Sequence, residues 1–348
     1  MEPDEKLQLL RSDAEEIVTE NELLALFESK RRPKAYIGFE PSGQLHIGNF
    51  LITARMIRKM LSCGFDFTIL LADWHAYIND KLEGNLERIR ACGRYMQAAF
   101  TYATEEVGTP RFVFASEMIS NGDYLAALIR NAKLVSLSRL KRALTIMGRN
   151  EDEAELDFSK LIYPLMQVTD IFDLDVDVAY AGLDQRRAHM LARDIAEQSG
   201  RKKPIAIHTP IISSLKGGGR MDVLSKMSKS DPMNAIFIHD DEEKIAEKMR
   251  GAYCPPELDG NPVLDICKYI IMPEAGCVEI LRDAKYGGDV TFDNFKELAE
   301  AYVAGRVHPL DLKKAAASGL WKVTKKYHDF FAAHASLMEW LEGAKVTR

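Results

Sequence analysis

The sequence predicts an α/β protein in which a doubly wound parallel sheet is followed by a second, mostly helical domain. Three observations lead to this fold class. Short apolar runs of strand length alternate with helical patterns through the first two thirds of the chain, which is the order of βαβ units. From about residue 240 the apolar residues recur with helical period. The chain has 348 residues, which is too many for one small core.

The individual elements follow from apolar runs and the residues that end them. Strands are predicted at 35–40, 66–72, 111–116, 177–182 and 204–210. Helices are predicted from about 46–50 onward, near 85–106, over 161–172 and over 184–200. Pro164 suits the first turn of its helix, where a missing N–H costs nothing. Gly200 ends the last helix, because glycine readily adopts the left-handed conformation of a helix C-cap.

These patterns divide the chain into two predicted domains. Residues 1–235 form a Rossmann-like domain that contains the sheet. Residues 236–348 form the helical domain.

Composition narrows the class of protein. No apolar run approaches the ~18 residues of a membrane span, and the acidic N-terminus lacks the basic start of a signal peptide, so we expect a cytoplasmic protein without a membrane anchor. The five cysteines form no C-x-x-C pair, so neither a disulfide framework nor a structural metal is expected. The net charge of −6 argues against a generic polyanion binder, although the basic stretches at 130–149 and 306–326 leave room for nucleic acid.

The stretch "PSGQLHIGN", residues 41–49, stands where a predicted strand ends and a helix begins. Open α/β sheets bind ligands at the carboxyl ends of their strands, and a helix start presents free backbone N–H groups to an anion. Gly48 would allow close approach of a ring or phosphate, and His46 could donate to a phosphate oxygen. Taken alone, the stretch is equally consistent with an ordinary turn that carries a surface histidine.

A second stretch, "KGGGRMDVLSKMSKSDP", residues 216–232, follows about 180 residues later. Its three glycines favour a mobile loop, and Lys226 and Lys229 could close over a triphosphate and follow its charge into a transition state. A solvated basic loop is the alternative interpretation.

Together the two stretches resemble the HIGH and KMSKS signatures of the class I aminoacyl-tRNA synthetases. The second signature is intact, whereas Asn49 replaces the final histidine of the first. The resemblance implies catalytic roles for His46, Lys226 and Lys229. It also implies ATP contacts at Gly38, His46, Gly48, Asn49, Gly182, Asp184, Lys226, Met227, Ser228, Lys229 and Ser230, with Mg²⁺ held mainly by the ATP phosphates.

A third stretch, "LIYPLMQVTDIF", residues 161–172, places Tyr163, Gln167 and Asp170 on one face of a helix. Burying a Gln and an Asp on so apolar a helix is expensive without partners, so a polar amino-acid pocket is the functional interpretation and a solvated stripe the alternative. In "GLDQR", residues 182–186, Asp184 could accept from ribose hydroxyls and Gln185 could face an amino-acid head group, or Asp184 could simply cap a helix.

From about residue 35 to 314 the chain resembles the tyrosyl-tRNA synthetases of the archaeal and eukaryotic-cytosolic type. That resemblance implies that Tyr36 and Asp170 hold the substrate phenol. It further implies that Tyr163, Gln167 and Gln185 surround the α-amino group, with Glu40 nearby, and that His75 lines the pocket. The expected partners are L-tyrosine, ATP and tRNA(Tyr), whose first anticodon base His308 and Asp311 would read. It also implies that residues 1–235 are the catalytic domain and residues 236–348 an anticodon-binding domain. An inserted segment at about 120–150 would meet the tRNA acceptor stem and form the interface of a homodimer.

Pairing a phenol at the pocket floor is the chemistry that separates tyrosine from phenylalanine. The nearest alternative is a tryptophanyl-tRNA synthetase, whose indole substrate offers one N–H donor. A non-catalytic RNA-binding relative and a nucleotidyltransferase of the same superfamily are two further alternatives.

Overall fold

The computed structural model describes residues 1–147, 157–217 and 232–343. The chain forms two compact units. Unit 1 comprises Met1–Gly43 and Thr53–Pro210 with a short piece from Trp340, and unit 2 comprises Gln44–Ile52 and Ile211–Glu339. The predicted boundary at 235/236 falls inside unit 2, and the assignment of separate catalytic and RNA-binding domains stays a prediction.

Unit 1 is built on a six-stranded sheet in the order β1-β6-β5-β2-β3-β4. All neighbouring strands are parallel except β1, which pairs antiparallel with β6. The strands are β1 (Glu16–Val18), β2 (Lys34–Phe39), β3 (Asp66–Leu71), β4 (Arg111–Phe114), β5 (Val178–Gly182) and β6 (Ile205–Thr209). The five predicted strands are therefore confirmed to within two residues, and the antiparallel edge strand β1 is an addition that its three half-buried residues did not signal.

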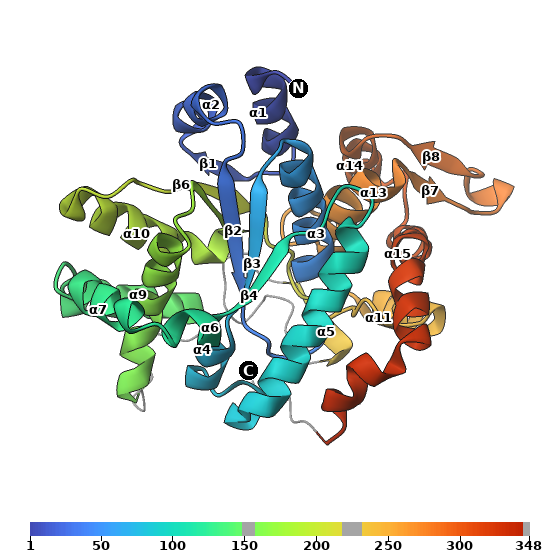
Figure 1. The fold of residues 1–348 in the computed structure, drawn as a ribbon. Coiled ribbons are helices and arrows are strands. Elements are labelled where there is room, and N and C mark those ends of the chain that lie inside the picture. The colour runs from blue at the N-terminus through green and yellow to red at the C-terminus, as the bar shows by residue number, and fades with distance from the viewer. Residues whose placement is uncertain (148–156, 218–231, 344–348) are drawn as a thin grey trace. The chain divides into compact units, whose positions relative to one another are not determined.

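Helices cover both faces of this sheet, with α9 and α10 on one side and α3 and α5 on the other (Figure 1). The helices that begin in unit 1, or connect to it, are α1 (Pro3–Arg11), α2 (Glu20–Ser29), α3 (Ile47–Ser62), α4 (Asp73–Ile78), α5 (Leu86–Thr104), α6 (Ala115–Ile119), α7 (Gly122–Ala132), α8 (Leu137–Ala143), α9 (Phe158–Asp173) and α10 (Arg186–Ser199). Gly200 follows α10 with φ of 66° as its C-cap, as predicted. This alternation confirms the doubly wound, Rossmann-like class.

The position of Pro164 differs from the prediction. The α9 helix begins at Phe158, where Asp157 accepts a hydrogen bond from Ser159 N, so Pro164 lies in the helix interior. Its missing N–H removes one i→i−4 hydrogen bond, but the Asp157 cap and the buried apolar face of α9 still stabilise the helix.

The strand order creates a switch point between β2 and β5. From β2 the chain proceeds outward through β3 and β4, whereas β5 and β6 extend the sheet on the opposite side. The helices that follow such strands diverge to opposite faces and leave a crevice at the carboxyl ends. Glu40 follows β2, and Asp184 and Gln185 follow β5, so the sheet brings the predicted site residues to this crevice.

Unit 2 is mostly helical, as predicted, and adds one short hairpin. Its elements are α11 (Glu242–Gly251), α12 (Pro262–Ile266), α13 (Met272–Ala275), α14 (Phe295–Val303), α15 (Pro309–Ala333) and the strands β7 (Val278–Ile280) and β8 (Val290–Phe292). The long helix α15 buries Leu312, Leu320 and Tyr327, and the ring of Phe50 meets that of Tyr327 edge-on at 5.0 Å between centroids.

Candidate active site

The deepest part of the site in unit 1 is a carboxylate surrounded by three rings. Asp170, on α9, is 1% exposed. Its Oδ1 accepts a hydrogen bond of 2.7 Å from the Tyr124 hydroxyl. Its Oδ2 lies 2.9 Å from Nε2 of His75, although the ring N–H does not point straight at that oxygen. Tyr36, on β2, is also 1% exposed. The carboxylate and the phenol that the sequence singles out are thus both buried in one place.

A second carboxylate lies nearer the end of β2. Glu40 is half-buried and accepts a hydrogen bond from the Tyr163 hydroxyl. The side-chain amide of Asn79 lies 3.2 Å from both Glu40 oxygens and 3.2 Å from the carbonyl of Met147. Gly38 lies on the same side of β2 as Tyr36, and a Cβ at this position would lie 3.9 Å from the Tyr36 ring.

Two glutamines connect α9 to the turn after β5. Gln167 donates to Gln185 Oε1 at 3.3 Å, and Gln185 donates in turn to the carbonyl of Ile146 at 3.0 Å. The Oε1 atom of Gln167 is buried without a hydrogen-bond partner among the described residues. A buried amide oxygen without a partner is costly, and a donor from a bound ligand would remove that cost.

Burial and charge set the protonation of this cluster. Burial, and then the charge of Asp170, raise the pKa of Tyr36 well above its usual range. Burial and Glu40 do the same to the pKa of Tyr163. Burial alone would lower the pKa of His75, but Asp170, with help from Glu40 and Asp73, raises it overall. Both phenols therefore remain neutral hydrogen-bond donors, and His75 gains its proton more readily than a free imidazole.

The first signature stretch is ordered at the start of α3, within unit 2. The His46 N–H donates to Asn49 Oδ1 at 3.1 Å, and the Asn49 N–H donates to His46 Nδ1 at 3.3 Å. This reciprocal pair satisfies two backbone donors of the helix start. Asn49, which replaces the histidine of the signature, therefore helps to cap α3. A Cβ at Gly48 would lie 3.3 Å from His46 Nδ1, so glycine makes room for the histidine ring.

The remaining predicted nucleotide contacts are only partly described. Gly38 is exposed on β2, and Gly182 and Asp184 are half-buried at the end of β5 and just after it. The second signature, Lys226, Met227, Ser228, Lys229 and Ser230, lies outside the described residues.

His308 and Asp311 are brought together in the first turn of α15. His308 precedes the helix and accepts a hydrogen bond from the Leu310 N–H at Nδ1, which is a capping role. Asp311 is half-buried, and His308 is exposed. A groove of about 350 Å³ lies beside this turn between α11 and α15, lined in part by Leu310 and the basic residues Arg250, Lys313 and Lys314.

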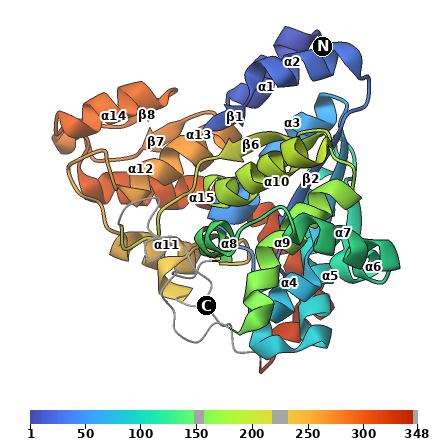
Figure 2. The same ribbon diagram turned by 90° about the vertical axis from the view of Figure 1, so that its left-hand side faces the viewer.

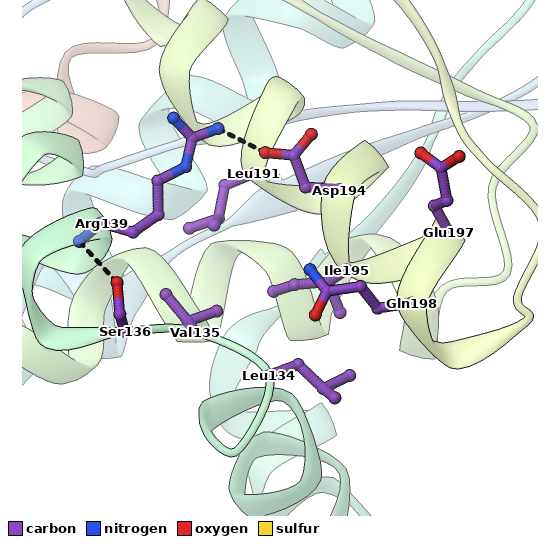
Figure 3. A pocket seen from close by; sticks show the side chains of 9 residues that line it. All are labelled: Leu134, Val135, Ser136, Arg139, Leu191, Asp194, Ile195, Glu197 and Gln198. Carbon is purple, nitrogen blue, oxygen red and sulfur yellow. Dashed lines mark hydrogen bonds and ion pairs between the residues drawn. The ribbon is translucent and has the colours of Figure 1, made fainter.

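A separate hollow in unit 1, of about 460 Å³, lies between the start of α8 and α10 (Figure 3). Arg139 closes one side through an ion pair of 2.5 Å with Asp194. Of the basic residues in this segment, Arg130, Lys133, Lys141 and Arg142 are exposed and form no ion pair within the described part of the chain. They are the residues of this segment best placed to meet a polyanion.

Sequence reasoning missed two residues of the pocket, Asn79 and Tyr124. Asn79 follows His75 by four positions, so helical spacing places both on one face of α4, and that signal could have found it. Tyr124 has no comparable signal, because a tyrosine on the buried face of a helix reads as ordinary core.

Within the described residues no helix is long and apolar enough to cross a membrane. The same residues contain no group of three or more His, Cys, Asp or Glu side chains placed to hold a metal ion.

Comparison with known proteins assigns the family. The family described as "tRNA synthetases class I (W and Y)" matches residues 28–324. The chain therefore belongs to the class I tRNA synthetases of the W and Y group.

Two of the similar proteins are named as ligases that join tyrosine to tRNA. A tyrosine–tRNA ligase from Aeropyrum pernix is 49% identical over 359 residues, which cover 99% of this chain and 98% of that protein. The structure of the tyrosyl-tRNA synthetase from Pyrococcus horikoshii complexed with L-tyrosine matches with a TM-score of 0.92 and 39% identity, covering 99% of this chain and 100% of that chain. A tryptophanyl-tRNA synthetase from Encephalitozoon cuniculi matches with a TM-score of 0.69, covering 94% of this chain and 89% of that chain, but at 18% identity it shows a shared fold alone.

Proposed function

We propose that this chain is a tyrosine–tRNA ligase, which activates L-tyrosine with ATP to tyrosyl-adenylate and transfers tyrosine to tRNA(Tyr). The observation that carries this proposal is the buried pair of Tyr36 and Asp170, each 1% exposed, in a chain whose full-length relatives are named for tyrosine. A phenol is the substrate group that can satisfy both, because its hydroxyl donates to a carboxylate and accepts from a neutral phenol.

The two ends of tyrosine would be held by separate clusters. Asp170 would accept the phenol proton, with Tyr36 and His75 beside it. Glu40 would face the α-ammonium group, together with Tyr163, Gln167 and Gln185. Glu40 supplies a negative charge, and the unpaired Oε1 of Gln167 supplies a second acceptor. Charge-assisted hydrogen bonds of this kind are the strong ones.

The chemical step requires no nucleophilic side chain. The tyrosine carboxylate attacks the α-phosphate of ATP in line, and pyrophosphate leaves, so catalysis consists of positioning and charge stabilisation. His46, Lys226 and Lys229 would stabilise the charge that develops on pyrophosphate. Gly38, Gly48, Asn49, Gly182, Asp184, Met227, Ser228 and Ser230 would complete the ATP contacts. Mg²⁺ would arrive with ATP and be held mainly by its phosphates.

For tRNA, the turn that begins α15 is the proposed reader of the anticodon. Asp311 can accept from the N1–H and N2–H₂ groups of an unpaired guanine, and the exposed ring of His308 can stack on a base. The groove beside Leu310, with Arg250, Lys313 and Lys314 on its walls, supports a path for the phosphate backbone along the same helices.

The proposed assembly is a homodimer through the segment at 120–150. The apolar side chains of Leu125, Ile129 and Leu137 are 61%, 54% and 58% exposed, respectively. Leu125 and Ile129 are four residues apart and so lie on one face of α7. An exposed apolar stripe of this kind is typical of a protein interface.

ATP–pyrophosphate exchange tests the proposed function directly. We expect exchange with tyrosine and none without an amino acid or with tryptophan at the same concentration. Exchange that depends on tryptophan would establish the tryptophan–tRNA ligase instead. Absence of exchange with every amino acid, from protein that is folded and binds ATP, would overturn the assignment as an active ligase.

A further inference from the structure

Tyr124 is a buried residue that contacts Asp170 from helix α7. It lies in α7, inside the segment predicted to form the dimer interface, and its side chain is 3% exposed. Its hydroxyl is 2.7 Å from Asp170 Oδ1 and 3.3 Å from the carbonyl of Met166. A hydroxyl has one proton, so Tyr124 donates it to the Asp170 carboxylate, which is the nearer acceptor and the charged one.

The orientation of a carboxylate is not fixed by its own side-chain torsions. The terminal torsion of aspartate is broad, so the plane of the Asp170 carboxylate must be held by its partners. The partners stand on different oxygens, with Tyr124 on Oδ1 and His75 at Oδ2. The hydrogen bond from Tyr124 to Oδ1, with the His75 ring close to Oδ2, restricts the rotation of the group and leaves its remaining lone pairs at defined positions.

We propose that Tyr124 is a positioning residue for substrate selection, which holds the Asp170 carboxylate in the orientation that accepts the phenol hydroxyl of tyrosine. The proposal rests on the proposed function, since it takes Asp170 as the acceptor of that hydroxyl. Tyr124 does not contact the substrate; it acts through Asp170.

The packing of α7 does not depend on this hydroxyl alone. Seven residues further along the same helix, the buried Asn131 donates to Thr169 Oγ1 of α9 at 3.0 Å. The α7 and α9 helices lie side by side (Figure 2), and the two bonds tie this pair of helices from positions about two turns apart on α7 to consecutive residues of α9. Only the bond from Tyr124 ends on the carboxylate that faces the pocket. Asn131 therefore provides a control that loosens the same helix pair without removing a partner of Asp170.

The experiment measures kcat/KM for tyrosine and for phenylalanine in ATP–pyrophosphate exchange, for the full chain and for Tyr124→Phe. Loss of a hydrogen bond to a charged group corresponds to roughly a tenfold to hundredfold change. We expect the ratio of kcat/KM for tyrosine to that for phenylalanine to fall by about this factor, mainly through a higher KM for tyrosine. Phenylalanine has no hydroxyl to place, so its own kcat/KM should change little.

Two controls separate positioning from general loosening. Asn131→Ala should leave the ratio unchanged. Tyr180→Phe removes another buried hydroxyl of unit 1, which pairs with Thr209 Oγ1 at 3.1 Å, and should also leave the ratio unchanged. Asp170→Ala should lower the ratio by itself, and adding Tyr124→Phe to it should lower the ratio no further, because Tyr124 then has no carboxylate to hold. If Tyr124→Phe does not fold, Tyr124→Met serves in its place, because it removes the hydroxyl and keeps an apolar side chain.

The outcomes distinguish this inference from the function on which it rests. A parent chain without tyrosine-dependent exchange overturns both. A parent chain that prefers tyrosine, with Tyr124→Phe retaining that preference or losing it only as much as Asn131→Ala does, overturns the role of Tyr124 and leaves the proposed function standing. An additional loss in the Asp170→Ala background would likewise show that Tyr124 does not act through Asp170.

Discussion

Replacing Glu40 by glutamine tests the site at the end that faces the amino group of the substrate. In the structure Glu40 accepts from the Tyr163 hydroxyl and from the amide of Asn79. Glutamine keeps the shape of the side chain, but it removes the negative charge and turns one acceptor into a donor. That donor would face Asn79, which already donates, or the hydroxyl of Tyr163.

The magnitude follows from these contacts. A hydrogen bond to a charged group contributes about 1.5–3 kcal/mol, and each 1.4 kcal/mol is about a factor of ten in affinity. Glu40 is only half-buried, so solvent screens its charge and the lower part of this range applies. We expect the KM for tyrosine in ATP–pyrophosphate exchange to rise roughly 10- to 30-fold, with a smaller change in kcat.

A substrate analogue without the amino group makes this test specific. 3-(4-Hydroxyphenyl)propionate should inhibit the parent chain and Glu40→Gln with nearly the same inhibition constant, because this analogue has no ammonium group for Glu40 to bind. Glu22→Gln is the matched control, since Glu22 pairs with Arg193 away from the pocket, and its KM for tyrosine should stay unchanged. The reasoning is refuted if the analogue loses as much affinity as tyrosine does, because Glu40 would then act through pocket shape.

Four further predictions concern other parts of the chain. Tyr36→Phe should lower the preference for tyrosine over phenylalanine by about tenfold, with little change in the KM for ATP, because it removes one partner of the phenol; an unchanged preference would contradict the pocket assignment. Lys226→Ala should slow adenylate formation in single-turnover kinetics while tyrosine affinity stays nearly constant, because a charge that stabilises the leaving pyrophosphate acts mainly in the transition state; an equal loss of affinity would make Lys226 a ground-state binder. Asp311→Ala should reduce charging of tRNA at least tenfold and leave tyrosine-dependent exchange intact, and normal charging would remove the anticodon role from α15. The folded-state pKa of His75 is raised, so protonation of His75 adds stability that is complete below about pH 6.5, the ordinary imidazole value, and is lost as pH rises through the raised value. The difference in unfolding free energy between the parent and His75→Gln, measured in urea, should therefore be larger at pH 6 than at pH 9. A difference independent of pH would contradict a charged His75.

Most of the framework of unit 1 could be predicted because its signals are local. Buried parallel strands appear as short apolar runs, so β2 and β3 were located almost to the residue. Gly200 ends α10 as predicted because only the backbone of one turn decides a C-cap. The common face of Tyr163, Gln167 and Asp170 likewise follows from helix geometry alone, and their contacts all point into one pocket.

The elements that were not predicted depend on distant partners. The β1 strand has three residues and becomes a strand only because β6 offers it an edge, with Ile17 opposite Ile207. The hairpin of β7 and β8 is equally short. Pro164 was placed in a first turn because proline favours that position, whereas the start of α9 is decided seven residues earlier by the cap at Asp157.

The sequence by itself determined which residue types are available for tyrosine activation, and it placed Tyr36 and Glu40 on the first predicted strand and Gln185 just after a later one. Only the tertiary structure decided which of these side chains meet, and with what additional partners. Asn79 reaches Glu40 across 39 residues of chain, and Tyr124 reaches Asp170 across 46. Periodicity states which face of an element is buried, but it carries no information about the element packed against that face. The partners that orient Glu40 and Asp170 therefore become visible only when the sheet order and the packing of α4 and α7 beside α9 are known.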